Sequence, residues 1–255
     1  MRITGNTVFI PGATSGIGRA LAERLHAAGN TVIVGGRRTE LLDDIARRHP
    51  GIGVQRIDTS DPASIATAAA EVVARHPRLD VVVTMAGIMR VEDWTTPEGV
   101  AESAERTVVT NLLGPIRLIA AFLPHLLGRP EATIMTVSSG LAFTPLRVTP
   151  TYNATKAAIH MLSESLRLQL AGTSVRVVEL VPPAVRTGLL PGQEESPFAM
   201  PLDEFADEVM AILDARPDVA EVQVENVKLL RYGEARGDYA EVVATLNRLD
   251  PHAAA

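Results

Sequence analysis

The sequence contains no cysteine, so disulfide bonds, thiolate metal sites and cysteine nucleophiles are all excluded. An excess of basic residues is also missing. The chain has 24 Lys and Arg against 30 Asp and Glu, and its net charge of −6 argues against nucleic acid as a partner. The six histidines show no metal-ligand spacing. We interpret them as mostly surface groups and predict no metal site.

Long hydrophobic runs are absent as well. Residues 118–128, an uncharged run in the middle of the chain, contain Pro124 and are too few to span a bilayer. Residues 1–10 are interrupted by Gly5 and Asn6, which leaves no room for the apolar core of a signal peptide. Hydrophobic residues make up 46% of the 255 residues, an ordinary share for a soluble globular protein. We therefore expect a cytoplasmic protein with no membrane partner.

Short apolar runs rich in β-forming residues alternate with helical segments along the chain. Strands are predicted at 7–10, 31–35, 53–57, 80–84, 132–137, 175–181 and near 220–224. Helices are predicted at 19–28, 41–49, after Pro62, about 98–125, from the segment of Tyr152 to about 170, at 202–215 and at about 237–249. This alternation predicts an α/β fold: a mainly parallel, doubly wound, Rossmann-type sheet of seven strands with helices on both faces.

No linker, composition break or repeat divides the chain, so we predict a single nucleotide-binding domain over residues 1–255, which ends in a short alanine tail at 253–255. Residues 186–201 hold three prolines and two glycines and interrupt the pattern. We expect them to begin a substrate lid over 186–216.

A glycine-rich turn follows the first strand and precedes a helix: Gly12-Ala13-Thr14-Ser15-Gly16-Ile17-Gly18. Glycines allow a pyrophosphate to approach the backbone, and a helix N-terminus offers free N–H groups to it. The spacing is G-x-x-x-G-x-G rather than the G-x-G-x-x-G dinucleotide fingerprint. Taken alone, a chance glycine turn is an equally good interpretation.

The second predicted strand ends in Gly36-Arg37-Arg38, where a dinucleotide-binding chain often carries an acidic residue for the adenosine ribose. Arginine suits a 2′-phosphate instead. We therefore predict NADP(H), with NAD(H) as second choice, and expect Arg37 to read the phosphate with Arg38 as the second candidate. The alternative is a pair of solvated loop arginines. Asp58, at the end of the third strand, is placed to contact the adenine.

The segment Tyr152-Asn153-Ala154-Thr155-Lys156 predicts acid/base chemistry. Residues four apart lie one turn apart on a helix face, where the Lys156 ammonium would lower the pKa of the Tyr152 phenol. Ser139, at the end of the fifth strand, could hold a substrate oxygen beside that phenol. Tyr-x-x-x-Lys also occurs by chance in many helices. Asn111, in an apolar stretch, is either structural or holds a water in a proton path.

With these residues assembled, the sequence resembles the short-chain dehydrogenase/reductase family over nearly its whole length. The resemblance rests on the glycine turn, Ala86-Gly87, Asn111, Ser139, Tyr152 and Lys156. It is closest to the DltE-like branch through Val137-Ser138-Ser139-Gly140-Leu141-Ala142-Phe143, Tyr152-Asn153-Ala154-Thr155-Lys156-Ala157-Ala158-Ile159-His160 and Val181-Pro182-Pro183-Ala184-Val185.

The resemblance implies a role for each site residue. Tyr152 would be the general acid/base, and Lys156 would lower its pKa and bind the nicotinamide ribose. Ser139, at the family's spacing before Tyr152, would orient the substrate, and Asn111 would anchor a water relay. The residues expected to bind the cofactor are Gly12, Thr14, Ser15, Gly16, Ile17, Gly18, Arg37, Arg38, Asp58, Thr59, Ala86, Gly87, Tyr152, Lys156, Pro182, Val185 and Thr187.

Two positions depart from the family pattern. Pro11 stands where the glycine turn usually begins with threonine, which removes a backbone donor. Thr84-Met85 replaces an asparagine pair whose amides would tie neighbouring strands together. Both changes bear on cofactor affinity and local rigidity, and neither position transfers protons.

The sequence predicts an NADP(H)-dependent oxidoreductase that interconverts a carbonyl and an alcohol in a small molecule. The alternatives are a non-catalytic regulator or redox sensor that binds the nucleotide, and an isomerase or dehydratase that recycles it. The family implies a homodimer or homotetramer formed through the long helices around Asn111 and Ala158. Trp94 either walls the pocket or packs on the surface. Side chains that hint at an apolar substrate pocket are Leu141, Phe143, Pro191, Pro197 and Phe198.

Overall fold

Seven parallel strands form one sheet in the order β3-β2-β1-β4-β5-β6-β7. The structure is a computed structural model that describes residues 1–249. The strands are β1 (Thr7–Pro11), β2 (Thr31–Gly36), β3 (Gly53–Arg56), β4 (Val81–Thr84), β5 (Ala132–Val137), β6 (Val175–Val181) and β7 (Glu221–Gln223). The strand order reverses between β1 and β4, which opens a ligand crevice at the carboxyl ends of the strands. The predicted doubly wound sheet is confirmed, and the predicted tail at 253–255 lies outside the described residues.

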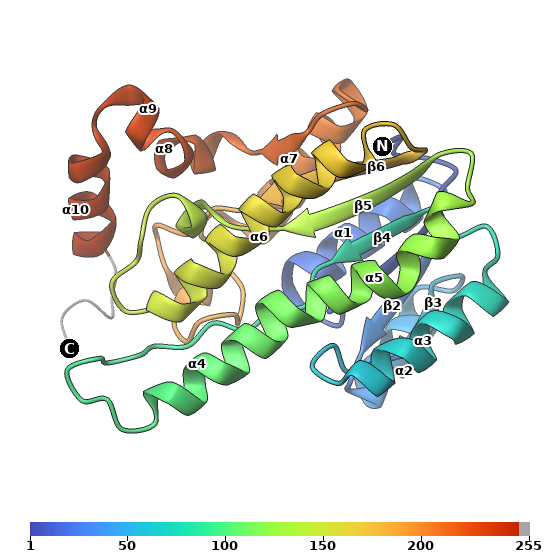
Figure 1. The fold of residues 1–255 in the computed structure, drawn as a ribbon, viewed down its shortest axis with the longest axis horizontal. Coiled ribbons are helices and arrows are strands. Elements are labelled where there is room, and N and C mark those ends of the chain that lie inside the picture. The colour runs from blue at the N-terminus through green and yellow to red at the C-terminus, as the bar shows by residue number, and fades with distance from the viewer. Residues whose placement is uncertain (250–255) are drawn as a thin grey trace.

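Helices cover both faces of the sheet (Figure 1). One face packs against α1 (Gly16–Ala27), α2 (Thr39–Arg48) and α7 (Leu202–Ala215). The other packs against α3 (Pro62–Arg75), α5 (Gly114–Leu127) and α6 (Pro150–Leu170). The central strands are buried along their whole length, which explains why their sequences are apolar runs rather than alternating patterns. Asp61 caps α3 by accepting from the Ala63 N–H, with Pro62 at the first helical position, as predicted.

The helix predicted at 98–125 is one continuous rod with an irregular middle. It comprises α4 (Val100–Val108), a π-helical turn (Val109–Leu113) and α5, and it crosses the front of the sheet beside α6 in Figure 1. Val100–Leu127 is long and apolar enough to span a membrane, since an 18-residue window within it has a mean hydropathy of 1.4. Leu118, Phe122 and Leu126 of this rod pack in the protein core. Core helices pass the same test, so this one feature is weak evidence for a membrane.

Two short helices near the C-terminus were not predicted. These are α8 (Lys228–Arg231) and α9 (Gly233–Arg236), and the final helix, α10, runs over Tyr239–Leu249 rather than from 237. Gly237, at φ +82°, ends α9 in a left-handed conformation that glycine adopts without strain. The three helices lie beyond the carboxyl end of β5, at the left of Figure 1. There the Leu230 carbonyl accepts from the Thr144 hydroxyl, which ties this segment to the loop before α6.

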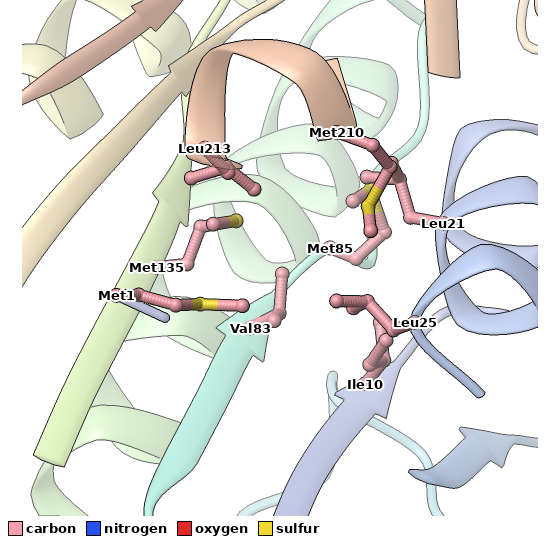
Figure 2. Close-up of a pocket in the computed structure, with 9 residues that line it drawn as sticks. All are labelled: Met1, Ile10, Leu21, Leu25, Val83, Met85, Met135, Met210 and Leu213. Atoms are coloured by element: carbon pink, nitrogen blue, oxygen red, sulfur yellow. The ribbon is translucent and has the colours of Figure 1, made fainter. Parts of the chain in front are cut away.

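Met85 is part of the core rather than of the cleft floor alone. Figure 2 shows its side chain next to that of Met210, and both line, with Met135, a small apolar cavity of about 10 Å³ between the sheet and the helices α1 and α7. A Cβ atom at Gly18 of α1 would lie 2.8 Å from the Met85 Cγ. Packing of a thioether against the glycine turn therefore replaces the amide hydrogen bonds expected at this position.

Candidate active site

The glycine turn forms a close-fitting cradle at the N-terminus of α1. Gly12 has φ +89°, and a Cβ atom there would lie 2.6 Å from the Ala86 Cα. A Cβ at Gly18 would lie 2.7 Å from the Gly12 carbonyl oxygen. The chain therefore needs glycine at both positions. The free N–H groups at the start of α1 face this turn, so the cradle fits the pyrophosphate of a dinucleotide.

A cleft of about 870 Å³ runs along the carboxyl ends of the strands. It brings together the glycine turn, the loops after β2, β3 and β4, and the start of α6. The predicted residues that line it are Gly12, Thr14, Ser15, Gly16, Ile17, Gly18, Arg37, Arg38, Asp58, Thr59, Ala86, Gly87, Ser139, Tyr152, Lys156, Pro182, Val185 and Thr187. Asn111 does not line the cleft.

The two arginines after β2 have different surroundings. The Arg38 guanidinium donates to the Thr14 hydroxyl at 2.9 Å and to the Ser15 hydroxyl at 3.4 Å. Arg37 is 69% exposed and has a long ion pair of 4.0 Å with Asp58. Arg38 therefore braces the glycine turn, whereas the Arg37 guanidinium has donors available to a ligand.

Tyr152 and Lys156 lie one turn apart near the start of α6, and both are buried. The Lys156 Nζ donates to the Val137 carbonyl at 2.8 Å and lies 5.5 Å from the centre of the Tyr152 ring. The Tyr152 hydroxyl is hydrogen-bonded to the Ser139 side chain. Ser139 occupies the turn after β5, where its Oγ also accepts from the Leu141 N–H at 3.1 Å. The predicted trio thus meets in one place.

The expected direction of the Tyr152 pKa shift is wrong for this structure. Burial raises the pKa of Tyr152 to about 12, although the bond from Ser139 acts in the opposite direction. Burial also lowers the pKa of Lys156 to about 8, while the nearby Glu179 carboxylate raises it. The physical reason is desolvation, because the charged forms of both groups lose water in an apolar setting. This loss outweighs the Ser139 hydrogen bond at Tyr152 and the Glu179 charge at Lys156.

Asn111 braces the backbone beside the site. It lies in the π-helical turn, is 1% exposed and donates to the Ile88 carbonyl at 2.8 Å while accepting from the Ile88 N–H at 2.8 Å. The same amide reaches the Thr155 hydroxyl at 3.4 Å. Since π turns often mark functional sites, the location fits a site residue. Its visible contacts are those of a structural brace for the loop after Gly87.

Both departures from the family pattern have local consequences. Pro11 is the last residue of β1 and pairs with Gly35, and the Gly12 N–H supplies the next bond to the Gly35 carbonyl at 2.8 Å. Thr84 is buried, and its hydroxyl has no hydrogen-bond partner among the described residues. Thr84 therefore lacks the inter-strand hydrogen bonds that an asparagine amide would make, whereas Pro11 leaves the pairing of β1 with β2 continuous.

The surroundings of Tyr152 are apolar, but only part of the predicted pocket contributes to them. Its buried neighbours are Met89, Leu146 and Leu190, with Leu141, Val148, Leu189 and Leu246 packed at their edge. Phe198 and Trp94 are each 61% exposed, and the Trp94 indole donates to Glu92 at 3.4 Å. Phe143 stacks on Arg231 at 4.2 Å. Leucines of residues 186–201, rather than Phe198, therefore approach the site.

The predicted lid has two unlike parts. Residues 186–201 form a loop whose two ends are joined by backbone hydrogen bonds. The Arg186 N–H donates to the Met200 carbonyl and the Met200 N–H donates to the Ala184 carbonyl, both at 2.9 Å. The helical remainder, α7, packs in the core through Phe205, Ala206, Val209 and Leu213. A lid motion is thus open only to residues 186–201.

A group of titratable side chains behind the site was missed by the sequence analysis. The potential ligand atoms of His160, Glu164, Glu179 and Glu221 lie within 4.8 Å of one another. They come from α6, β6 and β7, so no spacing in the sequence reveals them. The described histidines are also half-buried rather than on the surface, contrary to the prediction.

Comparison with known proteins gives the same assignment. A family model for the short chain dehydrogenases matches residues 6–197. The chain is 42% identical over 191 residues to the uncharacterized oxidoreductase DltE of Bacillus subtilis (strain 168), covering 74% of this chain and 75% of DltE.

Solved structures agree. A short-chain dehydrogenase of Burkholderia cenocepacia J2315 in complex with NADP superposes with a TM-score of 0.81 at 26% identity, covering 96% of this chain and 99% of that one. The 3-ketoacyl-(acyl-carrier-protein) reductase of Brucella melitensis complexed with NADH gives 0.77 at 25% identity, covering 86% and 96%. Together with the cradle and the Ser-Tyr-Lys trio, these matches show that the protein belongs to the short-chain dehydrogenase/reductase family, in its DltE-like branch, and is a cofactor-dependent oxidoreductase.

Proposed function

We propose that the protein is an NADP(H)-dependent oxidoreductase that interconverts a carbonyl and an alcohol, with Tyr152 as the group that moves the proton. The observation that carries the proposal is the meeting of Ser139, Tyr152 and Lys156 in the cleft that also holds the glycine turn. When bound, the nicotinamide supplies or accepts the hydride. The chain's own residues orient the substrate and handle the proton.

Each polar side chain has a distinct role in this proposal. Tyr152 stays protonated at neutral pH because burial raises its pKa to about 12, so it can donate its proton to a carbonyl oxygen. The Ser139 hydroxyl, bonded to the same phenol, holds that oxygen in place. The Lys156 ammonium stabilises the phenolate that remains. Asn111 keeps the loop after Gly87 against this site.

The proposed preference for NADP(H) over NAD(H) rests on Arg37 and Arg38, because no acidic side chain follows β2 at the position for the ribose hydroxyls. Of the two solved relatives, one is in complex with NADP and the other with NADH. They support a nicotinamide nucleotide as the cofactor but do not indicate which of the two this chain prefers.

The proposal includes the setting of the reaction. The substrate is a small molecule that enters between residues 186–201 and the loop 140–149, within a single domain over the whole chain. The protein works as a cytoplasmic homodimer or homotetramer. Exposed apolar side chains on the outer helices, Ile116, Leu127, Met161 and Leu168, support such an assembly.

Replacement of Tyr152 by phenylalanine tests the proposal. A panel of aldehydes and ketones is offered with NADPH, and its oxidation is followed by absorbance. We expect Tyr152→Phe to lose about 100-fold or more in kcat while its affinity for NADPH stays the same, because the proton donor alone is removed. Tyr239→Phe, the same change at the start of α10 and outside the cleft, is the matched control.

Equal rates for Tyr152→Phe and the wild type would contradict the role of Tyr152. If no compound of the panel supports turnover in the wild type although NADPH binds, the nucleotide-binding regulator becomes the better reading. Product formed without net change in NADPH would favour the isomerase or dehydratase.

A further inference from the structure

Glu179 is a carboxylate in a position where the strand pattern calls for an apolar side chain. On β6, Val175 and Val177 face α6 and pack in the core, and Glu179 is the next residue on that face. Its side chain is 0% exposed. Burying a carboxylate is costly unless hydrogen bonds and an opposite charge compensate. We therefore expect the neighbours of Glu179 to supply hydrogen bonds and an opposite charge.

The partners of Glu179 are the direct neighbours of the catalytic trio. The Ser138 hydroxyl donates to Glu179, and Ser138 is the residue before Ser139. The His160 Nδ1 lies 2.9 Å from the Glu179 Oε2, and His160 is one helical turn beyond Lys156 on the same face of α6. The carboxylate thus links the strand end that carries Ser139 to the helix that carries Lys156.

The other carboxylates near Glu179 each have an arginine partner, whereas Glu179 does not. On α6, Glu164 pairs with Arg167 at 2.7 Å, and on β7, Glu221 pairs with Arg231 of α8 at 3.0 Å. β5 contributes no titratable side chain. Among the described residues, Glu179 has hydrogen bonds from Ser138 and His160 but no ion pair with an arginine.

Besides His160, whose Nδ1 lies 2.9 Å from the carboxylate, the cations Lys156 and Arg231 both feel the charge of Glu179. The Lys156 Nζ donates to the carbonyl of Val137, the residue just before Ser138, which keeps the ammonium near Glu179. Burial lowers the pKa of Lys156, and the charge of Glu179 acts against that loss. Burial also raises the pKa of Glu179, and its bonds from Ser138 and His160 act in the opposite direction. The charge of Glu179 therefore offsets part of the desolvation of Lys156, whereas Ser138 and His160 stabilise the charged form of Glu179.

We infer that Glu179, held by Ser138 and His160, is a positioning residue that serves as the counter-charge of Lys156 and keeps its ammonium charged at the pH of the reaction. The inference rests on the proposed function, because it gives the charge of Lys156 a role in proton transfer. A neutral side chain at position 179 would leave the ammonium buried without its carboxylate, and Lys156 would lose its proton at lower pH.

The small number of lysines in the sequence allows the protonation of Lys156 to be observed directly. The chain contains only two lysines, Lys156 and Lys228. A protein labelled with ¹³C at the lysine side chains gives two Cε signals by NMR, and Lys228→Arg assigns them. Lys228 lies on the surface in an ion pair with Glu225, so its signal is an internal reference. The titration needs neither substrate nor turnover.

The test compares the Lys156 titration in the wild type, Glu179→Gln and Glu179→Met. We expect the pKa of Lys156 to lie about 1 pH unit lower in both variants, as expected for loss of a nearby opposite charge. Two variants are used because either one that folds decides the question. Glu164→Gln, the same change in a half-exposed carboxylate on α6, is the matched control and should leave Lys156 unchanged.

An unchanged pKa of Lys156 in the Glu179 variants would overturn the inference, and so would an equal shift in Glu164→Gln. Turnover provides a second readout: the alkaline limb of the reduction rate should move to lower pH in Glu179→Gln by the same amount. Failure of the inference and of the proposed function are separable. A wild type that is inactive on every carbonyl removes the function, whereas an NMR titration without a shift removes only the role of Glu179.

Discussion

Desolvation shifts the pKa of Tyr152 against a hydrogen bond from Ser139, and that of Lys156 against the charge of Glu179. Sequence reasoning found both residues because their spacing on a helix is a local property. It gave the wrong direction for the Tyr152 pKa, because the apolar neighbours Met89, Leu146 and Leu190 come from three distant segments. How deeply a side chain is buried depends on the whole fold, and burial is the largest influence on the pKa of both residues.

The lowered pKa of Lys156 predicts how the reduction rate depends on pH. Lys156 is charged below its pKa of about 8 and neutral above it, whereas Tyr152 remains protonated up to about 12. With saturating NADPH and carbonyl, kcat should be level at neutral pH and fall as the pH rises through about 8, since the ammonium no longer stabilises the developing phenolate. The measurement is kcat from pH 6 to 10 in buffers of constant ionic strength.

Circular dichroism over the same pH range is the control, because it separates loss of the ammonium from loss of the fold. A reduction rate that stays level or rises up to pH 10, in protein that remains folded, would show that the charge of Lys156 does not limit the reaction.

Among the secondary-structure elements, the strands and most helices were predictable, because apolar runs and helix caps such as Asp61 depend only on residues close together in the sequence. The π-helical turn around Asn111 was not, since a one-residue change of hydrogen-bond pattern leaves the hydrophobic period almost intact. The helices α8 and α9 were also missed. Each has only four residues, too few for local propensity to specify a helix. The helix α8 is held by the Thr144 hydroxyl of the loop 140–149, which donates to the Leu230 carbonyl.

Two threonines on neighbouring strands give a matched pair for a stability test. Thr84 on β4 and Thr136 on β5 are directly paired in the sheet and both are buried. The Thr84 hydroxyl has no partner among the described residues, whereas the Thr136 hydroxyl is 2.7 Å from that of Ser163. An unpaired buried hydroxyl is costly, so Thr84→Val should stabilise the protein by about 1 kcal/mol.

Thr136→Val is the matched control and should destabilise the protein by about 1 kcal/mol, because it removes a satisfied hydrogen bond. Urea unfolding, followed by circular dichroism, measures both changes. A loss of stability in Thr84→Val similar to that in Thr136→Val would show that the Thr84 hydroxyl has a partner in solution.

For the whole molecule, strand order decides which loops meet. Alternating strands and helices predicted the doubly wound sheet, and in such a sheet the ligand-binding residues gather at the carboxyl ends of the strands. The cleft does contain most of the predicted residues. The group of His160, Glu179 and Glu221 could not be foreseen, because β6 and β7 become neighbours only in the folded sheet and their side chains meet α6 there.

The proposed function depends most directly on whether this cleft binds NADPH in preference to NADH. The measurement is a fluorescence titration of the wild type, Arg37→Ala and Arg38→Ala with each nucleotide. We expect the wild type to favour NADPH, and Arg37→Ala to lose about tenfold or more in NADPH affinity with little change for NADH, because a hydrogen-bonded charge pair is lost. Arg38→Ala should weaken both nucleotides, since Arg38 braces the glycine turn that they share. Binding of neither nucleotide by the wild type, or equal binding of both that Arg37→Ala leaves unchanged, would contradict the account.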